Sequence, residues 1–394
     1  MPYAILALTL AAFAVGTTEF VVAGLLPNIS SSLHVTIRDV GQLVSVYAFG
    51  VVLGAPILTA ATRRVAQKPT LIGLLALFIG GNVVCALAPG YGVLMLGRVL
   101  AALAHGAFFG IGAILAADMA APGKKAQAMA LVFTGVTLAN IVGVPAGTFL
   151  GQHAGWRTTF WAVSVLAAVS VVGVLYLVPL ADRRPPAFGL VHELRSLLHP
   201  RVLLALSMTV FGFGAVFTVF TYIVPILQTF GGFNPTEIAA GLLVFGLGST
   251  AGMNIGGRLA DRRLMPALLG ILIALGIVLV ALRPMAATGV TAFANLFLFG
   301  TAGFATAPPL QTWIIRQARH APTMASGLNI GAFNLGNGIG AWLGGAVLTG
   351  PLGLAGVPIA GAFVAAIGVV LTLVSMLSMR SPRVDVADTD PAVS

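Results

Sequence analysis

Apolar stretches of about 20 residues follow one another along the whole chain, the length that a helix needs to cross the roughly 30 Å hydrocarbon layer of a bilayer. Runs such as LIGLLALFIGG at 71–81 lack the alternation of polar and apolar residues that strands of a membrane barrel show. The pattern therefore predicts helices. Twelve spans are expected, at residues 3–25, 39–61, 70–88, 92–117, 126–150, 156–179, 202–229, 237–258, 264–282, 288–315, 323–349 and 355–379.

The composition excludes a soluble globular domain. Hydrophobic residues make up 58% of the 394 residues and charged residues only 8%, against about a quarter charged in ordinary soluble domains. So few charges cannot cover the surface that a folded chain of this size exposes to water. The single cysteine, Cys85, can form no internal disulfide. We expect an all-α membrane protein, with the lipid bilayer as its solvent.

The basic residues indicate how the chain is oriented. Of the 20 lysines and arginines, 16 lie on the loops after even-numbered spans or on the C-terminal tail, whereas the opposite loops carry only Arg38 and Arg283. By the positive-inside rule, both termini are expected in the cytoplasm. Because topology accounts for the net charge of +10, no nucleic-acid partner is expected.

The chain divides near its middle, where the longest connection, 181–201, is charged and contains three prolines. A shift of 199 residues places Arg63 and Arg64 on Arg262 and Arg263, which indicates an internal repeat. Two pseudo-symmetric six-helix halves around a midplane site are typical of transporters. The expected organisation is an N-terminal six-helix bundle (1–180), a cytoplasmic linker (181–201), a C-terminal six-helix bundle (202–380) and a disordered acidic tail (381–394).

Glycines four residues apart form ladders in four spans, and this spacing lets a neighbouring backbone approach closely. The ladders are Gly50 and Gly54; Gly143, Gly147 and Gly151, with Pro145 between the first two; Gly248, Gly252 and Gly256; and Gly336, Gly340 and Gly344. One ladder alone more often marks a static packing surface. Their presence in spans two and five of one half, and eight and eleven of the other, predicts sliding contacts between the halves.

Ionisable residues inside spans cost about 2.5–3.5 kcal/mol or more at a helix centre, so each needs a reason. Glu19 in span one and Arg98 in span four are expected at a similar depth, roughly 9 Å below the outer surface, and could meet. His105 follows two turns deeper on the Arg98 face. Because these groups can exchange protons, we expect them to couple transport to a proton gradient. Alternatives are a structural Glu19–Arg98 pair, an acid that reaches the interface, and a packing histidine.

Polar groups in otherwise apolar spans are candidates for a substrate cavity. They are Asn140, Tyr222, Asn295, Gln311, Asn329 and Asn334. Each has the alternative role of satisfying a neighbouring backbone group. A mostly apolar cavity with one acid suits lipophilic or cationic solutes, and the amides equally suit sugars or nucleosides.

The sequence offers little for enzymatic chemistry. It contains no G-x-x-x-x-G-K-[ST] loop for ATP, no H-E-x-x-H motif and no cysteine–histidine cluster for a metal. We therefore expect no enzyme activity, no cofactor and no metal site. Energy is expected to come from an ion gradient, with protons favoured over sodium because no cluster of oxygen ligands is evident.

Several segments carry recognisable motifs: GTTEFVVAGLLPNIS (16–30), GAPILTAATRR (54–64), LMLGRVLAALAHGAFFG (94–110), GVPAG (143–147), GWRTTFW (155–161) and GGRLADRR (256–263). Together they resemble the major facilitator superfamily, and within it the twelve-helix drug:proton antiporters close to bacterial arabinose, chloramphenicol and purine-nucleoside exporters. The resemblance implies the major facilitator fold. It also implies that Arg98 matches the span-four arginine implicated in proton transfer, that Glu19 matches the acidic position of span one, and that GVPAG matches the antiporter signature.

One position departs from the family pattern. The loop after span two usually carries an aspartate before its basic residues, but the aligned residue here is Thr62, whereas the second-half copy keeps Asp261 and Arg262. A latch in the first half that depends on this acid is therefore in doubt. Asp118, at the inner end of span four, could pair with Arg63 or Arg64 instead.

The leading hypothesis is a proton-coupled efflux antiporter of the inner membrane that exports a small molecule (a drug, sugar or nucleoside) by alternating access. Its expected partners are the lipid bilayer, the substrate and protons, and it is expected to act as a monomer. An importer or facilitator of the same fold is the alternative. A membrane receptor or enzyme is a third possibility from another class.

Overall fold

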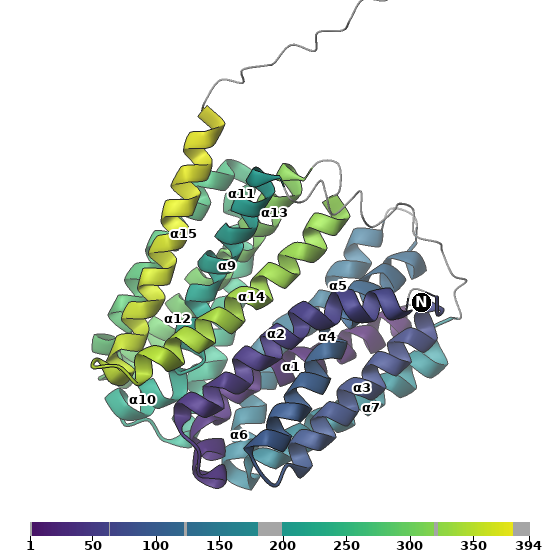
Figure 1. The fold of residues 1–394 in the computed structure, drawn as a ribbon, viewed down its shortest axis with the longest axis horizontal. Coiled ribbons are helices and arrows are strands. Elements are labelled where there is room, and N and C mark those ends of the chain that lie inside the picture. The colour runs from purple at the N-terminus through teal and green to yellow at the C-terminus, as the bar shows by residue number, and fades with distance from the viewer. Residues whose placement is uncertain (1, 63, 122–123, 180–198, 319–321, 381–394) are drawn as a thin grey trace, which may run out of the picture.

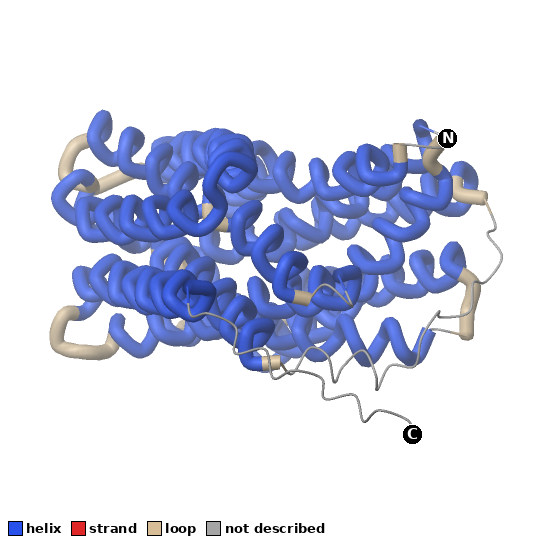
Figure 2. Tube along the Cα trace, turned by 90° about the horizontal axis from the view of Figure 1, so that it is seen from above, coloured by secondary structure: helices blue, strands red, loops and turns tan. Residues whose placement is uncertain are grey.

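The computed structural model describes residues 2–62, 64–121, 124–179, 199–318 and 322–380, and every regular element in these ranges is a helix. Figure 1 shows two groups of helices, α1 to α7 in purple and blue and α9 to α15 in teal to yellow. The helices lie side by side along the longest axis, with turns gathered at the two ends of the molecule (Figure 2). The predicted tail and almost all of the predicted linker lie outside the described residues.

The first half consists of α1 (Pro2–Leu33), α2 (Ile37–Thr62), α3 (Gln67–Leu87), α4 (Tyr91–Met119), α5 (Lys125–Leu138), the π-helical turn η1 (Ala139–Gly143), α6 (Val144–Ala154) and α7 (Trp156–Leu177). The second half consists of α9 (Pro200–Phe220), α10 (Ile223–Gly231), α11 (Pro235–Met285), α12 (Gly289–Ala305), α13 (Ala307–Gln317), α14 (Pro322–Leu348), the 3-10 turn η2 (Gly353–Ala355) and α15 (Gly356–Arg380).

The helices match the predicted spans. Within the described residues, ten helical segments are long and apolar enough to cross a membrane. One of them, α11, contains both predicted spans eight and nine, and α14 coincides with span eleven. The expected loop between spans eight and nine is absent because Arg263 alone leaves the helical conformation (φ −148°, ψ 80°). The chain turns back at Arg263, since Ala286, after the end of α11, lies beside Gly231, just before its start. Spans eight and nine are therefore two separate crossings, as predicted.

Three spans contain breaks, each close to a proline. Span seven is interrupted at Thr221 and Tyr222, between α9 and α10, three residues before Pro225. Span five passes through η1 just before Pro145. Proline has no backbone N–H, so it cannot donate the hydrogen bond that a regular helix makes at this position. The helical stretch from α12 to α13 is interrupted at Thr306, which precedes Pro308 and Pro309. These breaks place irregular backbone inside the bundle, where neighbouring helices surround it.

The two ends of the molecule differ in how the halves meet. We call the end with the turns at 34–36, 88–90 and 232–234 the closed end, and the opposite end, with 64–66 and the Arg263 kink, the open end. At the closed end, one buried apolar cluster contains residues of both halves, such as Leu25 and Phe217. Towards the open end, the buried residues form two separate clusters, one in each half. The halves are therefore packed together at the closed end and apart at the open end.

Helices α2 and α14 show the same divergence at the level of single residues. A side chain at Gly345, near the closed end, would contact Arg38 of α2 at 3.3 Å, and one at Gly338 would contact the ring of Phe49 at 2.9 Å. Gly331 lies seven residues earlier on the same helical face, and a side chain there would meet nothing within 4 Å. The α2 and α14 ribbons correspondingly separate towards the open end in Figure 1.

The predicted role of the glycine ladders is wrong. Gly143, Gly147 and Gly151 face α1, and the remaining ladders likewise face neighbours in their own half: α2 faces α4, α11 faces α12, and α14 faces α9. Four-residue spacing identifies a face that permits close approach but not which helix approaches it. The ladders therefore hold each half together, and other glycines, such as Gly338 and Gly345, lie between the halves.

Candidate functional site

Glu19 is a buried acid on α1, 9% exposed, on the face that meets both α4 and α14. Its carboxylate Oε2 lies 3.9 Å from Nε2 of His105. Its other oxygen, Oε1, accepts a hydrogen bond of 3.4 Å from Nδ2 of Asn337. The structure thus surrounds this carboxyl with a proton-exchanging ring from its own half and an amide from the other half.

His105 continues the polar cluster towards α2. Its Nδ1 lies 3.1 Å from the hydroxyl of Tyr47, and its ring packs at 5.1 Å from that of Phe109. Because Nδ1 faces the hydroxyl, Nε2 is left to face Glu19. The structure brings His105 to Glu19, as a role in proton exchange requires.

Arg98 does not form the ion pair with Glu19 that its depth allowed. Its guanidinium is fully buried and donates to backbone carbonyls instead: Nη1 to Thr18 at 2.7 Å, Nε to Leu43 at 3.4 Å and Nη2 to the carbonyl of Glu19 at 3.5 Å. It also stacks over the Tyr47 ring, 4.0 Å from the centroid. The alternative of a structural Glu19–Arg98 ion pair is therefore wrong. The guanidinium donates to backbone carbonyls of α1 and α2 and not to the Glu19 carboxylate.

Sequence reasoning missed Tyr47 and Asn337, two partners of this cluster. Asn337 follows Asn334 by three residues on the same glycine-rich span. It is a polar amide in an apolar span, the same feature by which the other candidate amides were chosen. Tyr47 stands in a span whose other positions are mostly apolar or small. Only the packing of α2 and α14 against α4 and α1 shows that these two side chains meet His105 and Glu19.

The cluster lies where the joined part of the molecule ends. Phe20, directly after Glu19, belongs to the apolar cluster that both halves share, and its ring packs 5.6 Å from that of Phe217. Val15, one turn before Glu19, belongs to the cluster of the first half alone. Glu19 therefore lies at the level where the shared core gives way to two separate cores, which we call the apex. A position between the two halves is where a carrier is expected to bind its substrate.

Three of the predicted cavity residues form or adjoin a polar chain in the second half. Thr209 donates to Oδ1 of Asn329 at 2.7 Å, Nδ2 of Asn329 donates to Gln311 at 2.8 Å, and Gln311 donates to Ser326 at 2.6 Å. Asn334, farther along the same helix, donates to the carbonyl of Ile330, and its buried Oδ1 has no hydrogen-bond partner. Gln311 and Ser326 are partly exposed, so this chain of hydrogen bonds reaches the surface of the second half.

The other three predicted cavity residues have different surroundings. Asn140, in η1, is buried where the backbone of η1 meets Gly246 of α11. Tyr222 is fully buried at the closed end, where its hydroxyl donates to the carbonyl of Ala341 at 3.0 Å. Asn295 lies inside the second half and donates to the carbonyl of Val278 at 3.0 Å. The structure does not bring Asn295 to the space between the halves, because α12 is packed on α11.

The charged residues expected to act as conformational latches lie at the open end. Asp261 and Arg262 are exposed beside the kink in α11, and Arg64 is exposed after α2. Asp118 stands in the last turn of α4. Of its two predicted partners, Arg63 lies outside the described residues, and the pairing of Asp118 with Arg63 or Arg64 stays a prediction.

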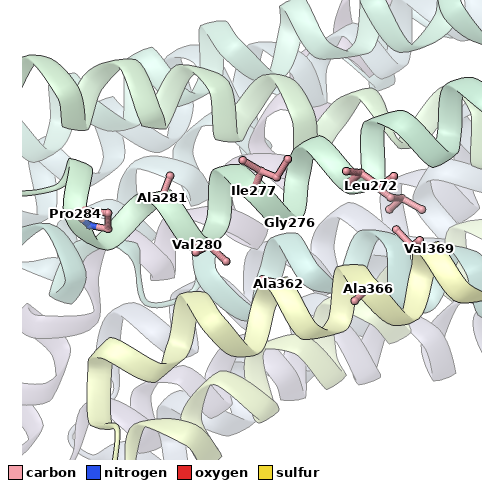
Figure 3. A pocket seen from close by; sticks show the side chains of 10 residues that line it. Leu272, Gly276, Ile277, Val280, Ala281, Pro284, Ala362, Ala366 and Val369 are labelled. Carbon is pink, nitrogen blue, oxygen red and sulfur yellow. The ribbon is translucent and has the colours of Figure 1, made fainter.

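An apolar groove with a volume of about 620 Å³ lies between the second part of α11 and α15, away from the Glu19 cluster. Figure 3 shows its lining, with Leu272, Ile277 and Val280 from α11 opposite Ala362 and Ala366 from α15. Ile277 is 64% exposed, as expected for a side chain that contacts lipid tails. The groove offers no polar group that could orient a solute, and it is distinct from the candidate site.

The arrangement of paired half-bundles around a buried acid defines a membrane transporter, and sequence comparison identifies the family. The profile of the Major Facilitator Superfamily matches residues 8–341. The chain belongs to this superfamily, and the predicted family and fold class are confirmed.

Relatives and solved structures agree with this assignment. The chain is 44% identical to the inner membrane transport protein YdhP of Escherichia coli over 383 residues, which is 97% of each chain. It is 36% identical to a chloramphenicol resistance protein of Streptomyces lividans, covering 86% of this chain and 88% of that protein. The crystal structure of a D-xylose–proton symporter has the same fold, with a TM-score of 0.74, 15% identity and coverage of 95% and 96%.

Proposed function

We propose that the chain is a proton-coupled exporter of the inner membrane that alternates the access of one central cavity between the two membrane faces. It acts as a monomer and uses the proton gradient with no bound cofactor. The observation that carries the proposal is the position of Glu19, a buried acid at the apex of the space between the halves, with His105 and Asn337 beside it. Burying a carboxyl in a membrane-spanning helix costs free energy, so a residue of this kind usually marks a functional site.

The distribution of charge supports an orientation with both termini in the cytoplasm. The described basic residues at the open end include Arg64, Lys68 and Arg201, together with Arg258 and the pair at the α11 kink. The closed end carries far fewer, in accord with the positive-inside rule. The open end is therefore assigned to the cytoplasm, and the conformation described here is the one in which an exporter takes up its load.

The substrate is a small, largely lipophilic molecule with some polar groups. Along the diverging part of α2, Leu53 and Ile57 are 59% and 58% exposed, and Leu328 of α14 is 38% exposed. Asn334, with its unpaired amide oxygen, and the partly exposed Gln311 supply the polar groups. The similarity to a chloramphenicol resistance protein supports efflux of a compound of this kind.

The test is gradient-driven transport by purified protein in proteoliposomes, with chloramphenicol, arabinose and purine nucleosides as candidate solutes. Glu19→Gln keeps the shape of the side chain but cannot release a proton. It should insert normally and keep solute exchange between the two sides, while gradient-driven accumulation falls by about 100-fold, within the range seen when a proton-transferring group is removed. Thr372→Val, which alters a buried hydroxyl bonded only within α15, is the matched control.

Each other result has a definite meaning. Normal gradient-driven accumulation by Glu19→Gln would move the proton site elsewhere, with His105 the next residue to substitute. Accumulation in the same direction as proton flow would make the protein an importer. Transport that ignores the gradient would make it a facilitator.

A further inference from the structure

Among the described residues, one side-chain hydrogen bond joins the two halves. It is the bond from Nδ2 of Asn337 on α14 to Oε1 of Glu19 on α1, 3.4 Å long. Both residues are buried, with Asn337 only 4% exposed. Elsewhere, the contacts between the halves are mainly apolar, such as the ring pair of Phe20 and Phe217. Within the described part of the chain, the side-chain hydrogen bond between the halves is thus made at the Glu19 carboxyl itself.

The link lies at the apex, where the apolar core shared by both halves gives way to two separate cores. Any motion that closes the open end and parts the closed end turns α14 relative to α1 about this level. The bond between Asn337 and Glu19 is therefore one of the contacts that such a motion must change. It is also the one whose strength depends on a proton.

The charged and titratable groups that face the Glu19 carboxyl come from the first half. They are His105 and Arg98 on α4, with Tyr47 on α2 behind them. Helices α10, α11 and α14 of the second half present a neutral surface at this depth, since the charged residues of α11 lie near its ends and its kink. From the second half, the group that contacts the carboxyl is the amide of Asn337, whose hydrogen bond depends on whether the carboxyl is ionised.

We propose that Asn337 is a proton-dependent latch, which holds the empty, ionised carrier in the conformation described here and releases it when Glu19 is protonated or when substrate displaces the amide. The inference rests on the proposed function and deepens it. A hydrogen bond from an amide to a carboxylate is roughly twice as strong as one to a neutral acid. Protonation therefore weakens the link without any other change in the contact.

The latch would keep proton movement coupled to substrate movement, which a buried acid alone does not ensure. An antiporter wastes the gradient if its empty, ionised form crosses back after releasing a proton, because each such cycle carries a proton across without substrate. Holding that form in place prevents the leak. A substrate that opens the latch must present its own hydrogen-bond donor, such as a hydroxyl or amine, to the carboxylate.

The experiment measures proton leak without substrate. Asn337→Leu, close in size to asparagine, and Asn337→Ala are reconstituted in liposomes with a trapped pH dye and an imposed pH gradient. Both should leak protons about tenfold faster than wild type or more, the scale expected when one charge-assisted hydrogen bond is lost. Thr372→Val, also a buried polar residue of the second half, should leak as wild type does.

A second measurement follows the conformation directly. Spin labels at exposed Ala60 on α2 and Leu328 on α14 span the open end, and Cys85 is buried, so labels attach to the introduced cysteines. In substrate-free wild type, raising the pH through the titration of Glu19 should increase the population with separated labels. The Asn337 variants should lose this dependence.

The outcomes separate the latch from the proposed function. If wild-type protein shows no substrate-driven proton movement, the proposed function fails. If it does, yet the Asn337 variants are as proton-tight as wild type, the latch alone is overturned. Should neither variant fold, a wild-type label distance that ignores pH overturns the latch, and a pH response that Glu19→Gln abolishes supports it.

Discussion

Arg98 shows how one buried cation can be satisfied without a carboxylate. Its guanidinium donates to carbonyls of α1 and α2 while projecting from α4, and its flat face lies on the Tyr47 ring. Three helices of the first half therefore converge on one side chain. Because Tyr47 also contacts His105, Arg98 fixes the position of the histidine that faces Glu19. Under the proposed function, its role would be to position the group that exchanges protons with Glu19.

This geometry predicts that lysine cannot replace Arg98. A single ammonium group cannot reach the carbonyls of Thr18 and Leu43 together, and it does not stack on Tyr47 as a planar guanidinium does. Arg98→Lys should lower gradient-driven transport by about tenfold or more, the effect of losing one or two charge-assisted hydrogen bonds. Transport rate and thermal unfolding of the detergent-solubilised protein are the measurements. Wild-type rates with lysine would show that the charge alone suffices.

The sequence predicted the depth of Glu19 and Arg98 but not their contacts. Depth follows from counting residues along a helix, whereas contact depends on how each helix is rotated about its axis. That rotation is set by packing against neighbours far away in the sequence, so it places Arg98 on carbonyls and Asn337, not Arg98, on the carboxylate. Asn337 could not be singled out, because its amide was one of several on the same span.

At the scale of helices, the glycine ladders determine which pairs pack most closely. In α6, Gly147 faces Val21 of α1, and its own carbonyl accepts a hydrogen bond of 2.8 Å from Thr159 of α7. In α14, Gly336 and Gly340 meet the backbone of α9 around Gly214. These are close contacts within a half, so each half can move as a rigid unit.

A bulky residue at Gly147 should therefore damage the first half itself rather than block its motion. Even a Cβ there would lie 2.8 Å from Val21 and 3.1 Å from Thr159, and overpacking of this kind costs about 1–3 kcal/mol or more. Gly147→Leu should reduce the yield and unfolding temperature of the purified protein. Gly80→Leu, where a side chain meets nothing within 4 Å, should not. A stable Gly147→Leu protein arrested in one conformation would restore the sliding role.

The predicted spans correspond closely to helices because hydrophobic length reports membrane crossing directly. The tightness of the join between spans eight and nine could not be predicted, since the charged segment there is typical of a loop, whereas Arg263 alone leaves helical geometry. The π-helical turn η1 could not be predicted from the sequence either. Pro145 indicates that a hydrogen bond is missing, but the sequence does not show how the backbone accommodates its loss.

At the scale of the whole molecule, the described residues join the halves by apolar packing at one end and by the Asn337–Glu19 hydrogen bond at the apex. Apolar contacts have no direction and adjust to small rotations, whereas a hydrogen bond depends on distance and angle. The protein therefore combines a broad, adaptable joint with one contact that is either made or broken. This combination suits a rocking motion between two states.

The row of Gly331, Gly338 and Gly345 on α14 gives this motion a direct test. A side chain at Gly331 meets nothing within 4 Å here, yet α2 must approach it when the open end closes. Gly331→Leu should fold normally but reduce turnover by at least about tenfold, the effect of a barrier raised by 1.4 kcal/mol. Proteoliposome transport measures this. Gly270→Leu, which also faces open space, is the control, and full activity of Gly331→Leu would show that α2 does not approach this face.

The same row has a pharmacological consequence. A compound that enters from the open end and fills the space beside Gly331 would act as a wedge, stopping turnover without competing for the proton at Glu19. Its inhibition would be non-competitive with respect to protons. A larger residue at Gly331 that excluded the inhibitor would also reduce export, because the new side chain would occupy the space that α2 must enter when the open end closes. A target of this kind restricts the routes by which a cell can escape the inhibitor.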